Sequence, residues 1–261
     1  MDFLLGLSVP LAIVLWGRWY YSLRLSPALR VTRPGRVAFG LLPVLCMIFL
    51  FAILKRFSAD SVKSDSPTAI LFVLFGASWV GLAQLVFGLL GISARDDVLE
   101  RGNSAAVWVI SGQLVGSTLC FAGANVGNGS GPEVVAFCAF LSTTALLLAW
   151  FLVECVGSVA DTITIDRHLG TGIRICGWLI ATGIVLGDAV TGNWKSVSTA
   201  VRDFAVCAWP AAATGLVVAL LERKLYKLGP NHEWNGPRKS AVLAAVYIVL
   251  ASGYAWKRGI H

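Results

Sequence analysis

The chain has 261 residues, of which 57% are hydrophobic and only 13% are charged, and its formal net charge is +7. A soluble domain carries about 25% charged residues, so this composition excludes a soluble globular protein. Nucleic-acid binding would need a basic face on a domain outside the membrane. The polar segments are too short to build such a domain, so we expect no nucleic-acid partner.

Taken in chain order, long apolar stretches divide the sequence evenly. A helix needs about 20 mostly apolar residues to cross the hydrocarbon core, where it satisfies its own backbone hydrogen bonds. Eight such stretches lie near residues 2–17, 37–54, 68–92, 104–127, 134–157, 173–192, 204–221 and 240–256. They predict an all-α, polytopic transmembrane bundle of about eight helices. The first stretch lacks a basic start and a cleavage site, so we interpret it as a retained helix rather than a signal peptide.

Basic residues concentrate in connectors that follow odd-numbered stretches. The segment 18–36 holds five arginines and no acid, and the segment 222–239 holds five Lys and Arg residues. The positive-inside rule then places these connectors in the cytoplasm and both chain ends outside. Three basic residues of the second connector oppose this orientation. Tryptophans near predicted helix ends, Trp178 among them, fit an interfacial aromatic belt.

A recurring pattern indicates internal repeats. A polar or basic start, followed by small residues and an apolar stretch, begins at residues 35, 103, 169 and 238. The nearly equal spacing predicts four repeated two-helix units, although eight helices in a short chain are evenly spaced in any case. On this basis we divide the chain into an N-terminal helix pair (1–67), a central four-helix unit (68–194) and a C-terminal helix pair (195–261).

Glycines three or four residues apart lie along one side of several predicted helices. Lipid tails are as apolar as Leu, so membrane helices associate by close packing at small residues. We therefore predict helix-packing faces, with conduit lining as the alternative. The glycines are Gly81 and Gly88 in the third stretch, Gly112, Gly116, Gly123 and Gly127 in the fourth, and Gly183 and Gly187 in the sixth.

The fourth stretch begins with a polar collar. Asn103 or Ser104 can accept hydrogen bonds from the unpaired N–H groups of the first helical turn. An acid such as Asp97 is also favoured near a helix N-terminus. Ala105 and Ala106 then open the helix with small side chains. A helix N-terminus of this kind can alternatively bind an anion or a lipid phosphate.

The middle of the chain, about residues 68–194, resembles the bacterial inner-membrane family catalogued as domain of unknown function 350, the YjfL-like proteins. The matching residues are Asp97, Asn103, Ala105, Ala106, Ser111, Gly112 and Gly116, then His168, Thr171, Gly172 and Trp194. The sequence departs from the family at Leu169 and Asp188, where the family tends to have Asn. The resemblance implies paired membrane helices, a place in the inner membrane and an association with membrane-stress proteins. It implies no chemistry.

Polar side chains inside the predicted helices are candidates for function, because a charge at the bilayer centre costs about 2.5–3.5 kcal/mol on insertion scales. The candidate intramembrane site comprises Gln84, Gln113, Glu154, Arg174 and Asp188. Glu154 and Arg174 fall at a similar depth on consecutive stretches, so we expect an ion pair between them. We expect Asp188 to reach Lys195, Arg202 or water. The alternative is a path for protons or cations.

The remaining inventory indicates no catalytic chemistry. The six cysteines lie in predicted helices without metal-ligand spacing, and the three histidines lie in loops or at the chain end. We therefore expect no catalytic residue, no metal site and no cofactor. The sequence favours a non-enzymatic, multi-pass scaffold of the bacterial inner membrane, associated with membrane stress. Its expected partners are membrane lipids and other membrane proteins or further copies of itself. The alternative is an ion or small-solute channel or transporter using Gln84, Gln113, Glu154 and Asp188.

Overall fold

The computed structural model describes residues 2–25, 33–128, 131–229 and 233–259. Long helices dominate this described part of the chain, which contains no strand, so the predicted all-α bundle is confirmed. The long helices are α1 (Asp2–Leu25), α2 (Arg33–Phe57), α4 (Ser66–Leu89), α5 (Ser104–Ala124), α6 (Pro132–Gly157), α8 (Leu169–Ala189), α9 (Val197–Leu228) and α10 (Pro237–Gly259). The short ones are α3 (Asp60–Ser64), η1 (Ala94–Glu100), α7 (Val159–Thr164) and η2 (Glu233–Asn235).

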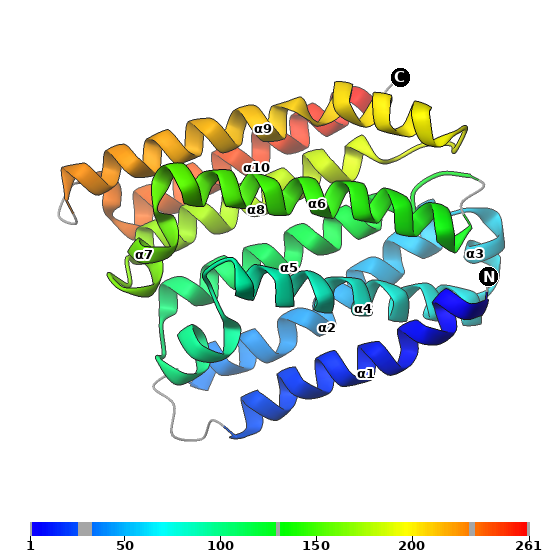
Figure 1. The fold of residues 1–261 in the computed structure, drawn as a ribbon, viewed down its shortest axis with the longest axis horizontal. Coiled ribbons are helices and arrows are strands. Elements are labelled where there is room, and N and C mark those ends of the chain that lie inside the picture. The colour runs from blue at the N-terminus through cyan, green and yellow to red at the C-terminus, as the bar shows by residue number, and fades with distance from the viewer. Residues whose placement is uncertain (1, 26–32, 129–130, 230–232, 260–261) are drawn as a thin grey trace.

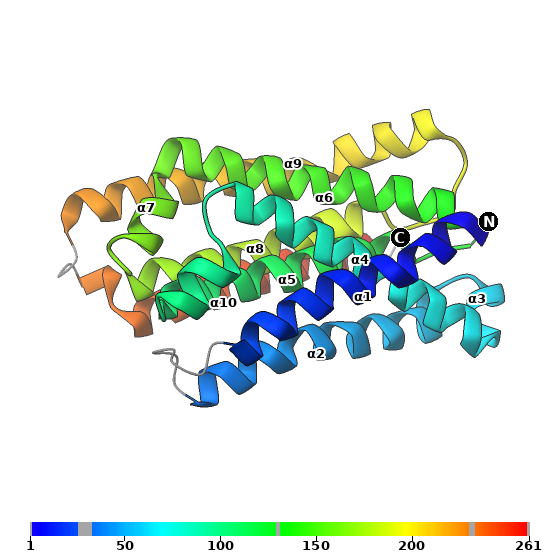
Figure 2. The same ribbon diagram turned by 60° about the horizontal axis from the view of Figure 1, so that its bottom comes forward.

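The long helices form two layers that run along a common direction (Figure 1). One layer contains α2, α5, α8 and α10 in that order, and each helix contacts the next. The other contains α1, α4, α6 and α9 (Figure 2), with contacts between α1 and α4 and between α6 and α9. Successive long helices alternate in layer and direction, so α2, α5, α8 and α10 all begin at the same end of the bundle (Figure 1). The fourfold repeat itself stays a prediction.

The helices α5 and α8 form the centre of the bundle. Within their apolar spans, 72% of α5 and 83% of α8 is buried inside the protein, whereas only 17% of α10 is buried. Large aliphatic side chains on the outer helices, such as Val249 and Leu250 on α10, stay exposed. Such a surface suits a hydrocarbon solvent, which imposes no penalty on exposed apolar groups.

Seven of the described helices are long and apolar enough to cross a membrane: α2 from Phe39 onward, α4, α5, α6, α8, α9 and α10. Several helices extend beyond the apolar stretches that predicted them. The most extended, α9, runs to Leu228 and so includes basic residues that the sequence assigned to a connector. One expectation is wrong: Trp178 is 1% exposed and lies against Gly215 of α9, so it belongs to the core rather than to an interfacial belt.

Candidate functional site

The polar start of α5 is a buried capping site. The side-chain Oδ1 of Asn103 accepts hydrogen bonds from the backbone N–H groups of Ala105 (3.0 Å) and Ala106 (3.3 Å). Its Nδ2 donates to the carbonyl of Ile163, at 2.6 Å. Asn103 therefore satisfies the first turn of α5 and ties it to α7 at the same time. Its neighbour Asp97 instead accepts from the Ser93 N–H (2.9 Å), so this carboxylate closes the η1 turn and does not cap α5.

Five of the predicted packing glycines lie where α5 meets α8. A Cβ added at Gly112 would stand 2.8 Å from the Cα of Cys176, and one added at Gly183 would stand 2.6 Å from the Cα of Gly116. These are backbone atoms, which cannot rotate aside. The two helices therefore approach backbone to backbone, as small residues permit. The glycines placed there are Gly112, Gly116, Gly123, Gly183 and Gly187.

The other three glycines lie elsewhere. A Cβ added at Gly81 would meet the side chain of Leu15 on α1, at 2.9 Å. One added at Gly88 would meet nothing within 4 Å. Gly127 lies beyond the end of α5 in a turn with φ +125°, so it does not belong to the α5 face to which the spacing assigned it.

The predicted ion pair of Glu154 with Arg174 is wrong, because Arg174 pairs with Glu222 of α9. The Arg174 Nε and Nη2 atoms each donate to this carboxylate at 2.6 Å, and both side chains are buried. The remaining donors reach Ser240 (2.7 Å), the Trp234 carbonyl (3.2 Å) and Thr171 (3.0 Å). Every polar edge of the guanidinium thus has a partner. That is the condition under which a buried charge pair is tolerated.

Sequence reasoning missed Glu222 because it stands at the end of an apolar run, beside basic residues that resemble a connector. The signal that could have identified it is the cation in α8. An Arg inside a membrane helix requires a partner at its own depth. The sequence offers two acids near that level, and only the contacts of α8 with α9 select Glu222.

The two remaining carboxylates have local or distant partners. Glu154 accepts from the backbone N–H of Ala160 (2.6 Å), and so supports the turn between α6 and α7. Asp188 accepts from Nη1 of Arg258 at 2.5 Å. The expected partners of Asp188, Lys195 and Arg202, are therefore replaced by a residue at the end of α10. Glu154 is near the C-terminal end of α6 and Asp188 near that of α8, and these two helix ends lie at opposite ends of the bundle (Figure 1).

The two intramembrane amides are poorly satisfied. Gln113 is 1% exposed, and neither its Nε2 nor its Oε1 has a hydrogen-bond partner. Ser117, one turn further along α5, and Thr182 on α8 also have buried hydroxyls without partners. The Nε2 of Gln84 on α4 lacks a partner as well. Among the described residues, Gln84, Gln113, Glu154 and Asp188 therefore do not converge on one polar cavity.

A cavity of about 650 Å³ adjoins the Arg174–Glu222 pair at the end of the bundle where α8 begins. Thr171 lines this cavity and also donates to Glu222, at 3.1 Å. His168 stands beside it and caps α8, because its Nδ1 accepts from the Thr171 N–H at 3.1 Å. Burial is the main cause that lowers the pKa of His168, and the Arg174 cation lowers it further. A neutral imidazole is the form that can accept this bond.

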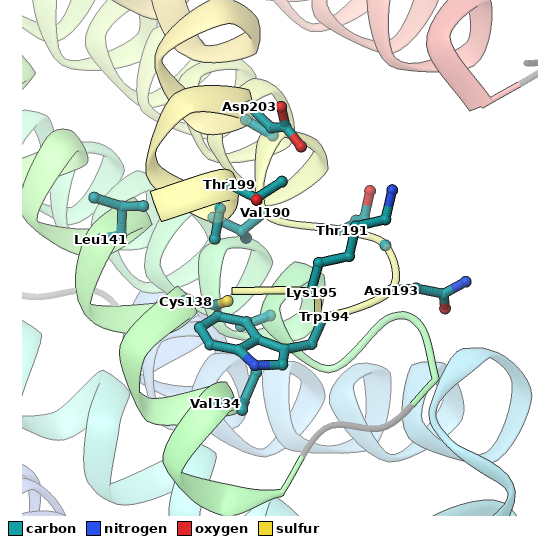
Figure 3. Close-up of a pocket in the computed structure, with 14 residues that line it drawn as sticks. Val134, Cys138, Leu141, Val190, Thr191, Asn193, Trp194, Lys195, Thr199 and Asp203 are labelled. Atoms are coloured by element: carbon teal, nitrogen blue, oxygen red, sulfur yellow. The ribbon is translucent and has the colours of Figure 1, made fainter. Parts of the chain in front are cut away.

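At the opposite end, a small cavity of about 70 Å³ lies among the ends of α6, α8 and α9 (Figure 3). The Trp194 ring forms part of its wall and meets the Phe137 ring edge-on, with 5.8 Å between centroids. The side chains of Thr199 and Asp203 face it from α9 (Figure 3). A space of this size accommodates water rather than a solute.

Comparison with known proteins identifies a family. The model of the family described as Domain of Unknown Function (DUF350) matches residues 59–190. This segment runs from the start of α3 to the end of α8. It includes the capped start of α5 and the α5–α8 interface. The match confirms the resemblance seen in the sequence, and its bounds lie close to those of the predicted central unit. No curated protein and no solved structure matches the chain.

Proposed function

The chain belongs to the DUF350 family of membrane proteins, and on that premise we propose that it is a scaffold without catalytic activity. The observation that carries the proposal is the centre of the bundle. There α5 and α8 meet backbone to backbone, and no lumen separates them. The Arg174–Glu222 pair then fixes α9 to the other side of α8. Such a framework is rigid in the middle and presents apolar helices at its edge.

The outer surface supports the same proposal. In α10, α9 and α2 only 17–28% of the apolar span is buried, so these helices offer broad apolar faces to lipids, to other membrane proteins or to further copies of the chain. We place this scaffold in the bacterial inner membrane, with a role in membrane stress.

Site-specific photo-crosslinking tests the scaffold. A photoreactive residue at Val249, which is 68% exposed on α10, should give a discrete protein adduct in intact membranes. The matched control is Ala244 on the same helix, which is buried where α10 meets Gly177 of α8, and it should give none. Adducts with lipid alone at Val249 and at exposed positions of α2 and α9 would contradict the proposal.

A channel is the second candidate, and one observation favours it. Gln113, Ser117 and Thr182 are buried polar groups without partners, and such groups are ordinarily satisfied by protein or water. A file of water through the centre would satisfy them. Proton and cation flux into vesicles containing the purified chain tests this candidate. Flux that disappears in Gln113→Leu, with the melting temperature preserved, would establish the channel and replace the scaffold.

A further inference from the structure

A groove of about 480 Å³ separates α1 from α4 at the edge of the bundle, and we name it the α1–α4 groove. Leu15 and Trp16 of α1 and Leu85 of α4 line its apolar part. Arg18 of α1 and Asp96 of η1 stand at its polar end. The two helices run in the same direction (Figure 2), so Arg18 and Asp96, which follow these apolar residues in the chain, lie nearer the end of the bundle. An amphiphilic molecule has the same arrangement, with an apolar part followed by a polar end.

The length of the groove also suits an amphiphilic molecule. Along α4 its wall runs from Gly81 to Leu89 and then continues to Ser93 and Asp96. Eight residues of helix rise about 12 Å, which gives an acyl chain room to lie against the apolar wall. The groove is at the edge of the bundle, where α1 packs mainly against α4.

The polar end carries one cation and one carboxylate that make no ion pair with any described residue. These are Arg18 and Asp96, and both are exposed. The nearby Arg95 is already neutralised by Glu100, with 3.1 Å between Nε and Oε1. The lining of the groove therefore offers a ligand one positive and one negative side chain. That pattern complements a zwitterion better than a purely anionic group.

We propose that the α1–α4 groove binds one phospholipid with an ethanolamine head group. Its phosphate lies at Arg18 and its primary ammonium at Asp96, and an acyl chain follows Leu15 and Leu85. This site is independent of the scaffold function and of the buried Arg174–Glu222 pair.

A substitution at Gly88 tests occupancy of the groove. Gly88 lines the groove, and an added Cβ there meets nothing within 4 Å, so Gly88→Leu should fill the space without disturbing helix packing. Gly253→Leu on α10 is the matched control, because that glycine also has open space and lies outside the groove. The chain is reconstituted in an equimolar mixture of ethanolamine, choline and glycerol phospholipids, purified, and analysed for retained lipid by native mass spectrometry.

Wild type and Gly253→Leu should retain one ethanolamine lipid, enriched several-fold over the other two, and Gly88→Leu should lose it at an unchanged melting temperature. Arg18→Gln should weaken retention of all three lipids. Asp96→Asn should abolish only the preference for ethanolamine over choline, since a quaternary ammonium donates no hydrogen bond. Preferential retention of the anionic glycerol lipid, or equal retention of all three by wild type, would overturn the proposal. Retention unchanged in both Gly88→Leu and Asp96→Asn would overturn it as well.

Discussion

The α5–α8 interface and the α1–α4 interface both contain helical glycines, but only the first is closed. At α5–α8 a Cβ added at a glycine meets backbone atoms of the other helix, whether the facing residue is a glycine, as for Gly123, or a leucine, as for Gly116. At α1–α4 a Cβ added at Gly81 meets only the side chain of Leu15, one added at Gly88 meets nothing within 4 Å, and a groove remains between the helices. Small residues permit close packing of membrane helices, but glycines on one helix do not by themselves bring a neighbouring helix into backbone contact.

The largest loss of stability that we expect comes from breaking the buried ion pair between α8 and α9. Glu222→Gln leaves the Arg174 guanidinium buried without its counter-charge, which should cost about 3–5 kcal/mol. The purified variant should melt far below wild type or fail to accumulate. The double variant Arg174→Met, Glu222→Leu removes both charges and should regain most of the loss. A double variant as unstable as the single one would mean that the hydrogen bonds to Thr171 and Ser240 matter more than the charge.

The second prediction tests the comparison of the two interfaces directly. Gly116→Leu forces a side chain against the Leu179 carbonyl, which stands 2.8 Å from the added Cβ, so overpacking should cost about 1–3 kcal/mol or more. Gly81→Leu meets only the flexible Leu15 side chain and should cost clearly less. Melting temperatures in one detergent measure both. Equal losses would contradict the distinction between closed and open interfaces.

A third prediction compares the caps that begin α5 and α4. Asn103 is buried and makes three hydrogen bonds, whereas Asp65 is exposed and its carboxylate receives the N–H and hydroxyl of Thr68. Loss of a cap costs about 0.5–2 kcal/mol. Asn103→Ala should reach the upper end of that range, because it also strands the Ile163 carbonyl, and Asp65→Ala should stay near the lower end. The reverse order of melting temperatures would show that burial does not decide the value of a cap.

The smallest effect is a dependence of stability on pH at the start of α8. The pKa of His168 is lowered in the folded chain, chiefly by burial, so the unfolded chain binds the extra proton first. The contribution of His168 to the free energy of unfolding is then fully present above the unfolded pKa of about 6.5. It declines as the pH falls toward the lower pKa of the folded chain. His168→Asn keeps a capping oxygen and should remove this part of the acid sensitivity. An identical pH profile for the variant would exclude His168 as its source.

The family motif acquires a physical explanation from the same central region. Asn103 caps α5. Ala105 is small because Gly172 of α8 approaches it: a Cβ placed at Gly172 would stand 2.6 Å from the Ala105 carbonyl oxygen. His168 and Thr171 form the corresponding cap of α8. The matching residues of the sequence thus describe two helix starts and the surface between them. The sequence motif alone could indicate a cap but could not tell which helix the alanines would meet.

The sequence by itself determined the membrane-spanning class, the long helices and the capped start of α5. Hydropathy, helix length and capping depend on residues within a few positions of one another, and the pattern of the chain records them. Only the tertiary structure decided that Arg174 pairs with Glu222 rather than Glu154, that Asp188 pairs with Arg258 seventy residues away, and that Gly88 faces a groove. Sequence position gives the depth of a residue in the membrane. The packing of the helices decides in which direction its side chain points and which helix it contacts.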